Sequence, residues 1–583
     1  MRRTKIVCTL GPATDTLPLL QALIAAGMDV ARLNFSHGTI AEHGRRIELL
    51  RQAAAGAGKD IALMLDTKGP EIRLGTFRQG RVTLKTGDRF VLTTRDVAGD
   101  AGKVSVSYPG LPADVRPGTV ILLADGVIEL TVEAADDTDI VCQVVHGGEV
   151  SDRKGVNVPG ITVDLPAVTE KDIIDIRFGL EMGIDSVAAS FIRQAADVLA
   201  VRQILEEAGA DCDIIAKIEN QDAVKNIDEI IRAADGIMVA RGDLGVEIGS
   251  EEVPLIQKMI IEKCNHAGKP VVTATQMLES MLGSPRPTRA ETSDVANAIF
   301  DGSDAIMLSG ETAAGRYPVE AVRTMDRIAR RTESALKFEE ILSRKTIGPL
   351  RSVTDAIGHA TCHTAQDLGA SAIITATTSG HTARIIARYR PQCPIIAVTP
   401  EDKVVRRLAL TWGVVTCKAA PMESTDEMFR VAVQGALDTG LVRPGDLVVI
   451  TAGIPMGITG TTNLIKVHVV GDVLARGTGI GNKAASGAVR VVRCPLENDG
   501  QFAAGDILVT TGTDSSYIPL FRKAAAVVTE EGGLTSHAAI AGMNIGIPVI
   551  VGVEGATRLL PEGTLITVDS ISGLIYRGLV NVM

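Results

Sequence analysis

The sequence predicts an α/β protein built around a (β/α)8 TIM barrel, and two observations support this. Short apolar runs alternate with amphipathic helical stretches, and the runs lie at 6–10, 30–35, 61–65, 186–191, 214–218, 237–239, 271–275 and 305–308. Strands that alternate with helices form parallel sheets through right-handed crossovers, and eight such units close a barrel. Aromatic residues make up only 3% of the chain, so the core must be aliphatic, which suits buried parallel strands.

A chain of 583 residues is too long for one hydrophobic core, and changes along the sequence predict four domains. The barrel is expected at 1–70 and 168–345. An insertion at 71–167 has short β-type runs and glycine turns, which predicts a small β-barrel lid domain. An α/β regulatory domain is expected at 346–472, and a glycine-rich β/α domain with one helix near His537 at 473–583.

Two helix starts are legible within the barrel region. Thr169 and Asp172 have the spacing of a capping box, in which each side chain bonds a backbone N–H of the other residue. Pro318 fits the first turn of a helix that buries Val322 and Met325.

Composition excludes several functional classes. The formal net charge is −11 and no dense Lys/Arg tract occurs, which argues against nucleic-acid binding as a main task. The eight cysteines are scattered without a C-x-x-C pair, which predicts reduced thiols in a cytoplasmic protein rather than a disulfide framework or zinc site. No signal peptide and no membrane-spanning run is expected.

Reactive residues follow six of the eight predicted strands, at 32–36, 66–73, 217–220, 240–245, 273–277 and 309–312. In a (β/α)8 barrel the reacting groups come from these carboxyl ends and the loops after them. One Asp or Ser after a strand is often only a helix N-cap, but six such ends together are poorly explained by capping alone. The sequence therefore predicts an active site at this end of the barrel.

The residue types at these ends indicate phosphoryl transfer with a divalent metal. Glu219 and Asp243 offer the hard oxygen ligands that Mg²⁺ or Mn²⁺ prefers, and no Cys/His cluster is available for zinc. Arg32, Arg73 and Lys217 supply the positive charge that a moving phosphoryl group requires. Lys217 and Glu219 are two positions apart along a strand, so both side chains should face the inside of the barrel at its rim.

Seven motifs along the chain resemble those of a known family. TLGPA (9–13), RLNFSHG (32–38), DTKGPEIR (66–73), KIEN (217–220), ARGDLG (240–245), TQMLESM (275–281) and LSGET (308–312) are similar to those of pyruvate kinases. The resemblance runs in order over about 1–471. It implies transfer of the phosphoryl group of phosphoenolpyruvate to ADP, giving pyruvate and ATP in the last step of glycolysis under allosteric regulation.

The resemblance also implies roles for single residues in the reaction. Glu219 and Asp243 would hold Mg²⁺ or Mn²⁺, and Lys217 would stabilise the transferring phosphoryl group. The backbone N–H groups of Gly242 and Asp243, with Thr275, would bind the carboxylate of phosphoenolpyruvate; an N–H at the start of a helix suits an anion. Thr275, or a water that it orients, would supply the proton to the enolate, although a threonine hydroxyl alone is a poor acid.

Nucleotide and potassium sites are implied in the same way. Phosphates of substrate and nucleotide would be contacted by Arg32, Arg73 and Lys154, with Asn34 also at the nucleotide. A potassium ion would be coordinated by Asn34, Ser36, Asp66 and Thr67. Potassium-dependent members of the family have Glu where Glu71 stands, so K⁺ dependence is predicted. The family also implies a homotetramer.

Two other functions account for part of this pattern. A metal-dependent 2-oxo-acid lyase on a related barrel accounts for Glu219 and Asp243, but not for Arg73, the potassium cluster or the lid. A non-catalytic metabolite sensor would have lost metal-binding residues or Lys217, and none is lost.

A second anion site is predicted in the α/β domain. The segment formed by Thr377, Thr378, Ser379, Gly380 and Thr382 follows a strand and opens a helix, so its N–H and hydroxyl groups would surround an anion. It resembles the phosphate loop for allosteric activators in pyruvate kinases, and the expected activator is AMP or a sugar phosphate. A plain capped helix start is the alternative.

The last domain carries a different resemblance. EGGLTSHAAI (531–540) and GIPVIVG (546–552) are similar to the mobile phosphohistidine domain of phosphoenolpyruvate synthase and pyruvate phosphate dikinase. His537 stands where that domain carries phosphate, next to a helix N-terminus that would keep it neutral. The nucleotide-binding domain that charges such a histidine is not found in this sequence, which favours regulation or docking over phosphate transport.

Overall fold

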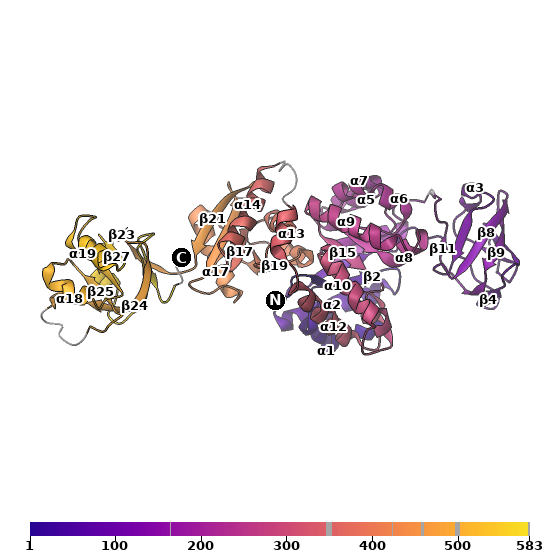
Figure 1. Cartoon of the computed structure of the whole chain (residues 1–583). Coiled ribbons are helices and arrows are strands. Elements are labelled where there is room, and N and C mark those ends of the chain that lie inside the picture. The colour runs from indigo at the N-terminus through magenta and orange to yellow at the C-terminus, as the bar shows by residue number, and fades with distance from the viewer. Residues whose placement is uncertain are drawn as a thin grey trace. The chain divides into compact units, whose positions relative to one another are not determined.

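The computed structural model describes residues 1–161, 163, 165–345, 352–422, 424–455, 460–495 and 502–580. The chain forms two compact units, and Figure 1 labels their helices and strands. The first comprises Met1–Ile347, Ala387–Arg390 and Glu401–Val415, and the second comprises Gly348–Ile386, Pro391–Pro400 and Thr416–Met583. The predicted boundaries of four domains stay a prediction.

The first unit contains a closed barrel of eight parallel strands in the order β1-β16-β15-β14-β13-β12-β3-β2. The prediction of a (β/α)8 barrel is therefore confirmed, and each predicted apolar run falls on one strand. The strands are β1 (Lys5–Leu10), β2 (Val30–Asn34), β3 (Ala62–Asp66), β12 (Ser186–Ala189), β13 (Asp213–Ile218), β14 (Gly236–Ala240), β15 (Val271–Ala274) and β16 (Ala305–Leu308).

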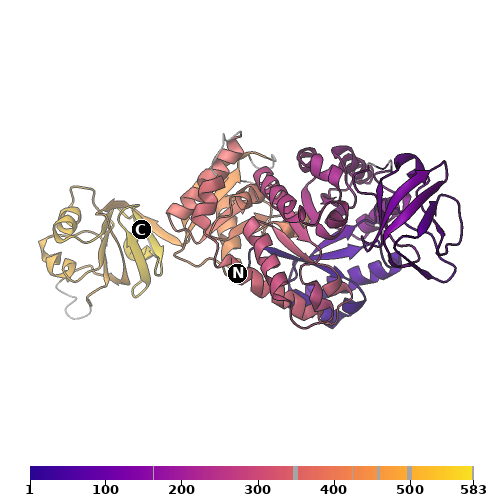
Figure 2. The same cartoon turned by 45° about the vertical axis from the view of Figure 1, so that its right-hand side comes forward.

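Helices surround this barrel, as Figure 2 shows. The longer ones are α1 (Leu17–Ala26), α2 (Ile40–Ala57), α4 (Glu170–Glu181), α5 (Ala195–Glu207), α9 (Val253–Ala267), α10 (Arg289–Asp301) and α12 (Pro318–Glu333). Shorter ones are α6 (Gln221–Lys225), α7 (Ile227–Ala233), α8 (Arg241–Glu247), α11 (Gly310–Ala313) and α13 (Phe338–Lys345). The capping box of Thr169 and Asp172 starts α4, and Pro318 lies in the first turn of α12, as predicted.

The barrel has two cores because successive strand residues point to opposite faces. One cluster of buried residues fills the interior and includes Val7, Met64, Met238 and Met307. The other packs the outward-facing residues against the helices. Leu410, far along the chain, also belongs to the interior cluster, so this part of the predicted α/β region joins the barrel unit.

A small β domain interrupts the barrel between β3 and β12, where the lid was predicted. Its sheets have the orders β11-β7-β8-β9-β5-β6 and β10-β4. Its elements are β4 (Arg81–Leu84), β5 (Arg89–Thr93), β6 (Lys103–Ser105), α3 (Leu111–Asp114), β7 (Val120–Leu123), β8 (Ile128–Ala135), β9 (Asp139–His146), β10 (Gly148–Ser151) and β11 (Val156–Asn157). It has its own apolar core, which includes Phe90, Leu130 and Cys142. This domain is called the lid below.

Beyond the barrel, a five-stranded sheet has the order β19-β18-β17-β20-β21. Its elements are α14 (Val353–Asp367), β17 (Ala372–Ala376), α15 (His381–Arg388), β18 (Ile395–Thr399), α16 (Asp402–Arg407), β19 (Val414–Lys418), α17 (Thr425–Asp438), β20 (Leu447–Gly453) and β21 (Thr462–Val469). Strand β19 was not predicted, because its residues are only partly buried and do not form an apolar run.

The C-terminal region has an eight-stranded sheet in the order β22-β29-β28-β24-β25-β26-β27-β23. Its elements are β22 (Val473–Arg476), β23 (Thr478–Ile480), β24 (Ala484–Val491), β25 (Ile507–Thr510), α18 (Ile518–Phe521), β26 (Ala526–Thr529), α19 (His537–Ile545), β27 (Val549–Val551), α20 (Ala556–Leu559), β28 (Leu565–Asp569) and β29 (Leu574–Arg577). The helix predicted near His537 is α19.

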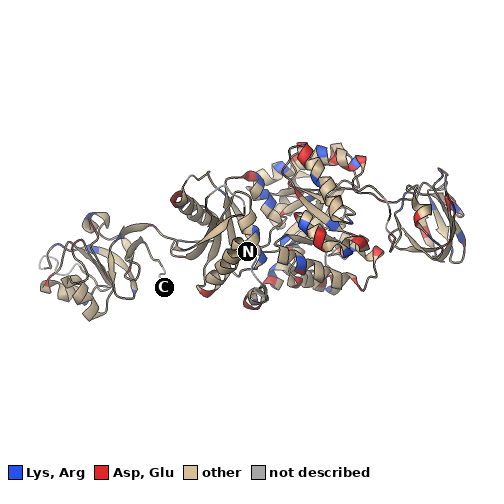
Figure 3. Ribbon diagram, turned by 90° about the horizontal axis from the view of Figure 1, so that it is seen from above, with Lys and Arg blue, Asp and Glu red and all other residues tan. Residues whose placement is uncertain are grey.

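Positions of positively and negatively charged residues are interspersed along the helices of the barrel (Figure 3). Among the described residues, no helix combines the length and the apolar character that crossing a membrane requires.

Candidate active site at the mouth of the barrel

Lys217 and Glu219 meet at the carboxyl end of β13, as their alternation along the strand predicted. The Nζ of Lys217 lies 2.9 Å from Oε1 of Glu219. The same ammonium lies 3.0 Å from Oδ1 of Asp66 and donates to Oγ of Ser190 at 2.6 Å. Lys217 and Glu219 are both buried, so this cluster lies beneath the surface of the mouth.

The surrounding charges keep this lysine protonated. Burial alone would lower the pKa of Lys217, but the carboxylates of Asp66 and Glu219 outweigh burial and raise it. Burial also raises the pKa of Glu219, with a further contribution from the negative charge of Asp243. Lys217 therefore carries a fixed positive charge at the place where the resemblance implies a phosphoryl group.

Asp243 lies in the first turn of α8 and its side chain is open to solvent. The protein around it nevertheless displaces enough water to raise the pKa of Asp243, and the charge of Glu71 adds to this rise. Repulsion between Glu219 and Asp243 is relieved by a cation between them, and their oxygens suit Mg²⁺ or Mn²⁺. No group of three or more His, Cys, Asp or Glu in the described ranges is placed to hold a metal.

The residues predicted for potassium lie at the ends of β2 and β3. Asn34 and Asp66 are paired in register on these neighbouring strands, and Oδ1 of Asn34 accepts a hydrogen bond from the N–H of Ser36 at 3.1 Å. Oδ2 of Asp66 accepts from Nε of Arg32 at 2.6 Å, and Arg32 also donates to Oγ1 of Thr9 at 2.9 Å. Arg32 is thus held firmly in the floor of the site.

Thr67 completes this group through the neighbouring strand. Its N–H donates to the carbonyl of Ala188 at 3.0 Å, and its Oγ1 accepts from the N–H of Ser190 at 3.1 Å. The structure therefore brings the ends of β2, β3 and β12 into one hydrogen-bonded set.

Thr275 and Gly242 contact each other at the ends of β15 and β14. The N–H of Gly242 donates to Oγ1 of Thr275 at 2.7 Å, and that hydroxyl donates to the carbonyl of Ala274 at 2.7 Å. Thr275 has a φ of +66°, a left-handed conformation that non-glycine residues adopt rarely and often at functional sites. The hydroxyl and the N–H predicted to bind a carboxylate thus lie at one place.

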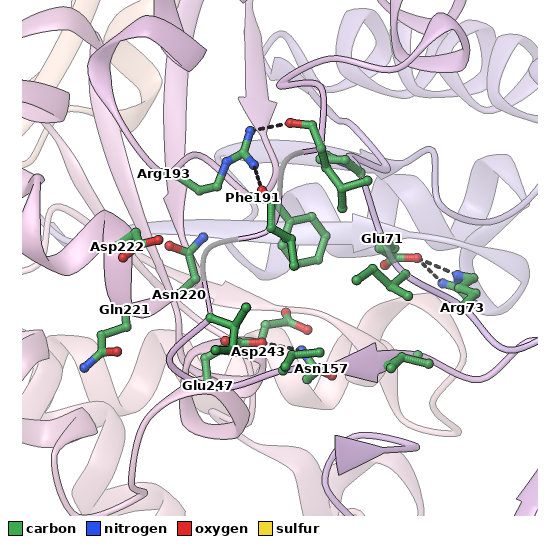
Figure 4. A pocket seen from close by; sticks show the side chains of 18 of the residues that line it. Glu71, Arg73, Asn157, Phe191, Arg193, Asn220, Gln221, Asp222, Asp243 and Glu247 are labelled. Atoms are coloured by element: carbon green, nitrogen blue, oxygen red, sulfur yellow. Dashed lines mark hydrogen bonds and ion pairs between the residues drawn. The ribbon is translucent and has the colours of Figure 1, made fainter. Parts of the chain in front are cut away.

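A cavity of about 400 Å³ lies between the lid and the barrel (Figure 4). Asp243 and Arg73 line it, and so does Lys154 of the lid. Nε of Arg73 donates to Oε2 of Glu71 at 2.6 Å, and Nη1 donates to the carbonyl of Arg153 at 2.9 Å. Two of the predicted phosphate-binding cations are therefore at the wall of the same cavity as a predicted metal ligand.

Other residues of the site were not predicted. Ser190 follows β12, the fourth barrel strand, and its position at a strand end was the available signal. His37 lies inside a quoted motif and lines the cavity. Arg193 and Glu247 also line it, but their contacts with the lid and the segment after it, through Val163, Leu165 and Asn157, are with residues distant in sequence, so no local pattern marks them.

The predicted activator loop lies between β17 and α15. The N–H of Gly380 donates to Oγ1 of Thr377 at 2.9 Å, and the hydroxyls of Thr382 and Thr462 are 2.8 Å apart. Thr378 is exposed and Ser379 is half-buried. A hydrogen bond within the loop thus occupies the hydroxyl of Thr377, whereas Thr378 is accessible to solvent and Ser379 is partly accessible.

His537 is the first residue of α19, whose N-cap is Ser536. Its Nδ1 lies 3.0 Å from Oγ1 of Thr513, and its ring packs edge-on against Phe521 with centroids 6.4 Å apart. The exposed side chains of Leu534, Ile540 and Met543 lie nearby in sequence.

Comparisons with known proteins agree with this arrangement. Three family models match: the pyruvate kinase barrel domain over residues 1–322, the pyruvate kinase alpha/beta domain over 355–468, and the mobile domain of PEP-utilising enzymes over 502–573. Two proteins named pyruvate kinase, from Geobacillus stearothermophilus and Bacillus licheniformis, are 57% and 56% identical over the full length of both chains. A crystal structure of a pyruvate kinase from Cryptosporidium parvum matches with a TM-score of 0.77 and 41% identity, covering 80% of this chain and 96% of that one. The chain therefore belongs to the pyruvate kinase family.

Proposed function

We propose that the chain transfers the phosphoryl group of phosphoenolpyruvate to ADP and releases pyruvate and ATP. The observation that supports this most directly is the cluster in which the ammonium of Lys217 lies 2.9 Å from Glu219, with Asp243 close enough to raise the pKa of Glu219. A lyase needs the metal ligands but has no use for Arg73 and Lys154 at the same cavity.

In the proposed transfer each residue stabilises charge or holds a group in place, and none forms a covalent bond to the phosphoryl group. Glu219 and Asp243 would hold Mg²⁺ or Mn²⁺, which when bound neutralises oxygens of the phosphoryl group. Lys217 stabilises the negative charge that develops as the group moves, and it is already desolvated and oriented. Arg73 and Lys154 hold the nucleotide phosphates from the wall of the cavity. Arg32, which is buried and bonded to Asp66, supports the substrate phosphate.

Once the phosphoryl group has left, the enolate of pyruvate must gain a proton at carbon. The N–H of Gly242 and the hydroxyl of Thr275 are 2.7 Å apart, so a substrate carboxylate bound there would lie beside that hydroxyl. We assign the proton to Thr275 or to a water that it orients. Conversion of the enol to a ketone makes the transfer strongly favourable in the direction of ATP.

A potassium requirement is the first test of this function. Phosphoenolpyruvate, ADP and Mg²⁺ are expected to give pyruvate in a lactate-dehydrogenase-coupled assay, with a rate at least tenfold lower when Na⁺ or tetramethylammonium replaces K⁺. The physical reason is that oxygens of Asn34, Ser36, Asp66 and Thr67 would bind the potassium ion. Glu71 is negatively charged, so it cannot supply the positive charge of that ion. Equal rates in all three salts would contradict the potassium site, and no pyruvate in any of them would contradict the function.

We further propose that the loop from Thr377 to Thr382 binds the phosphate of an activator, either AMP or a sugar phosphate. The exposed Thr378, the half-buried Ser379 and the position of the loop at the start of α15 support this.

The variant Thr378→Asp is expected to retain the unactivated rate while the activator concentration for half-maximal effect rises at least tenfold, because an added carboxylate repels phosphate. Activation curves for AMP and for several sugar phosphates measure this. Thr478→Asp adds the same charge at an exposed threonine of β23 and should leave the curves unchanged. If both variants respond like the parent protein, the loop does not bind the activator.

For the last domain we propose regulation or docking rather than phosphate transport through His537. We also propose a homotetramer acting in the cytoplasm, in line with the family and with the scattered thiols.

A further inference from the structure

One hydrogen bond joins the lid to the helix that carries a metal ligand. Nδ2 of Asn157, in the last lid strand β11, donates to Oε1 of Glu247 at 2.8 Å. Glu247 is the final residue of α8, and Asp243 lies in the first turn of the same helix. Both partners line the cavity above the site, as Figure 4 shows.

The carboxyl of Glu247 is poorly solvated, so it depends on the hydrogen bond from Asn157. Burial raises the pKa of Glu247, and the hydrogen bond from Asn157 partly offsets that rise. Within the described part of the chain, Asn157 is the only hydrogen-bond donor found for this carboxyl. Burying a carboxylate costs free energy, and a hydrogen bond offsets part of that cost. When a half-buried carboxylate has one hydrogen-bond partner and that partner moves away, much of this offset is lost. The lid position in which the bond forms is therefore favoured over one in which it is broken.

The opposite end of α8 is fixed to the barrel. Nη1 of Arg241 lies 2.8 Å from Oδ1 of Asp294, and Nη2 donates to the carbonyl of Thr275 at 2.8 Å. The N–H of Gly242 is held by Thr275 as well. The helix is thus anchored on the barrel at its start and on the lid at its end.

A second contact holds the segment by which the chain returns from the lid to the barrel. Arg193, in the loop after β12, donates to the carbonyls of Val163 and Leu165 at 2.8 and 2.7 Å. Its own position is fixed by Asp197, whose carboxylate accepts from the N–H of Arg193 at 2.8 Å. Arg193 thus ties Val163 and Leu165 to the barrel, and the bond between Asn157 and Glu247 separately ties the lid to the end of α8.

We propose that Asn157 and Glu247 are positioning residues that couple the lid to the metal site. With the bond formed, Lys154, three positions before Asn157 in the lid, lines the same cavity as Asp243. With the bond broken, the lid and the end of α8 move independently, so Lys154 and Asp243 are less well placed together. The inference rests on the proposed function, because it assigns Lys154 to the nucleotide and Asp243 to the metal.

An exchange of the two polar groups tests the coupling. Asn157→Asp places two carboxylates against each other, and their repulsion should break the contact. We expect the KM for ADP to rise at least tenfold and Mn²⁺ binding to weaken at least threefold. The KM for phosphoenolpyruvate should change less. Glu247→Gln keeps a carbonyl acceptor and should raise the KM for ADP by about threefold at most. The double variant restores a donor and an acceptor in exchanged positions, and both constants should return to within about threefold of the parent protein.

Mn²⁺ affinity is measured by electron paramagnetic resonance, and hydrogen exchange of the peptides over 156–161 reports lid opening without any turnover. Glu206→Gln, which removes an exposed carboxylate on α5, is the control and should change neither. Faster exchange in Asn157→Asp that reverts in the double variant supports the coupling. A double variant as impaired as Asn157→Asp, or an Asn157→Asp variant equal to the parent protein, would overturn it. Absence of pyruvate formation by the parent protein would instead contradict the proposed function and leave the exchange and Mn²⁺ readouts to decide the coupling.

Discussion

Replacing Lys217 with methionine is expected to lower kcat by roughly 10³-fold or more while Mn²⁺ still binds with near-normal affinity. Loss of one neutral donor to a developing negative charge costs about 10²–10³-fold in known enzymes, and Lys217 contributes a full, desolvated charge. Its ammonium is held by Asp66, Glu219 and Ser190, so it needs no reorganisation when the phosphoryl group moves. Steady-state rates and Mn²⁺ titration measure the two quantities separately.

This variant also removes the partner of two buried carboxylates, and that cost must be kept apart from catalysis. Breaking a buried ion pair destabilises a protein by about 3–5 kcal/mol, so circular dichroism and thermal unfolding should accompany the rates. The matched control is Lys225→Met, which removes an exposed ammonium that lies 3.1 Å from Asp222. A folded Lys217→Met variant with unchanged kcat would exclude Lys217 from the transfer step.

The residues at the barrel mouth could be predicted because the fold class dictates where they go. Parallel strands end at one edge, so Lys217, Glu219, Asp66 and Asp243 had to lie near one another once their strands were recognised. Alternation along β13 predicted which side Lys217 and Glu219 would face, and the 2.9 Å contact agrees. The sequence patterns that predict the residues at the barrel mouth are therefore local: each lies within one strand and the loop that follows it.

Other features depend on side chains from segments that no sequence pattern relates. Asn157 and Glu247 are 90 positions apart, and their contact arises only when the lid lies over α8. The pairing of Asp304 with Arg390, at 2.8 Å, joins the barrel to a residue whose neighbours predicted a separate domain. Such contacts follow from how finished elements pack together, and packing is decided by shape and burial rather than by local periodicity.

Replacing Asp243 with asparagine is expected to weaken Mn²⁺ binding by roughly 100-fold or more and to lower kcat/KM at fixed metal concentration by a similar factor. Residues that only support a ligand already contribute about 10–100-fold to metal affinity, so loss of a charged ligand should cost at least as much. The side chain is open to solvent and keeps its size, which makes misfolding a poor explanation of any loss. Excess metal should restore part of the activity.

The effect of negative charge along the cavity must be distinguished from direct ligation of the metal by Asp243. A variant of Asp222 serves as the control. It lines the same cavity and lies 3.1 Å from Lys225, and Asp222→Asn removes the same unit of charge. Ligation by Asp243 predicts a change of less than about threefold for Asp222→Asn, since removing a diffuse negative charge alters a cation's affinity only modestly in water. Equal losses in the two variants would mean that the cavity attracts the metal through its overall field, and Asp243 would no longer be assigned as a ligand. Because Asp243 raises the pKa of Glu219, its loss should also lower that pKa, so the metal affinity that remains should persist to lower pH.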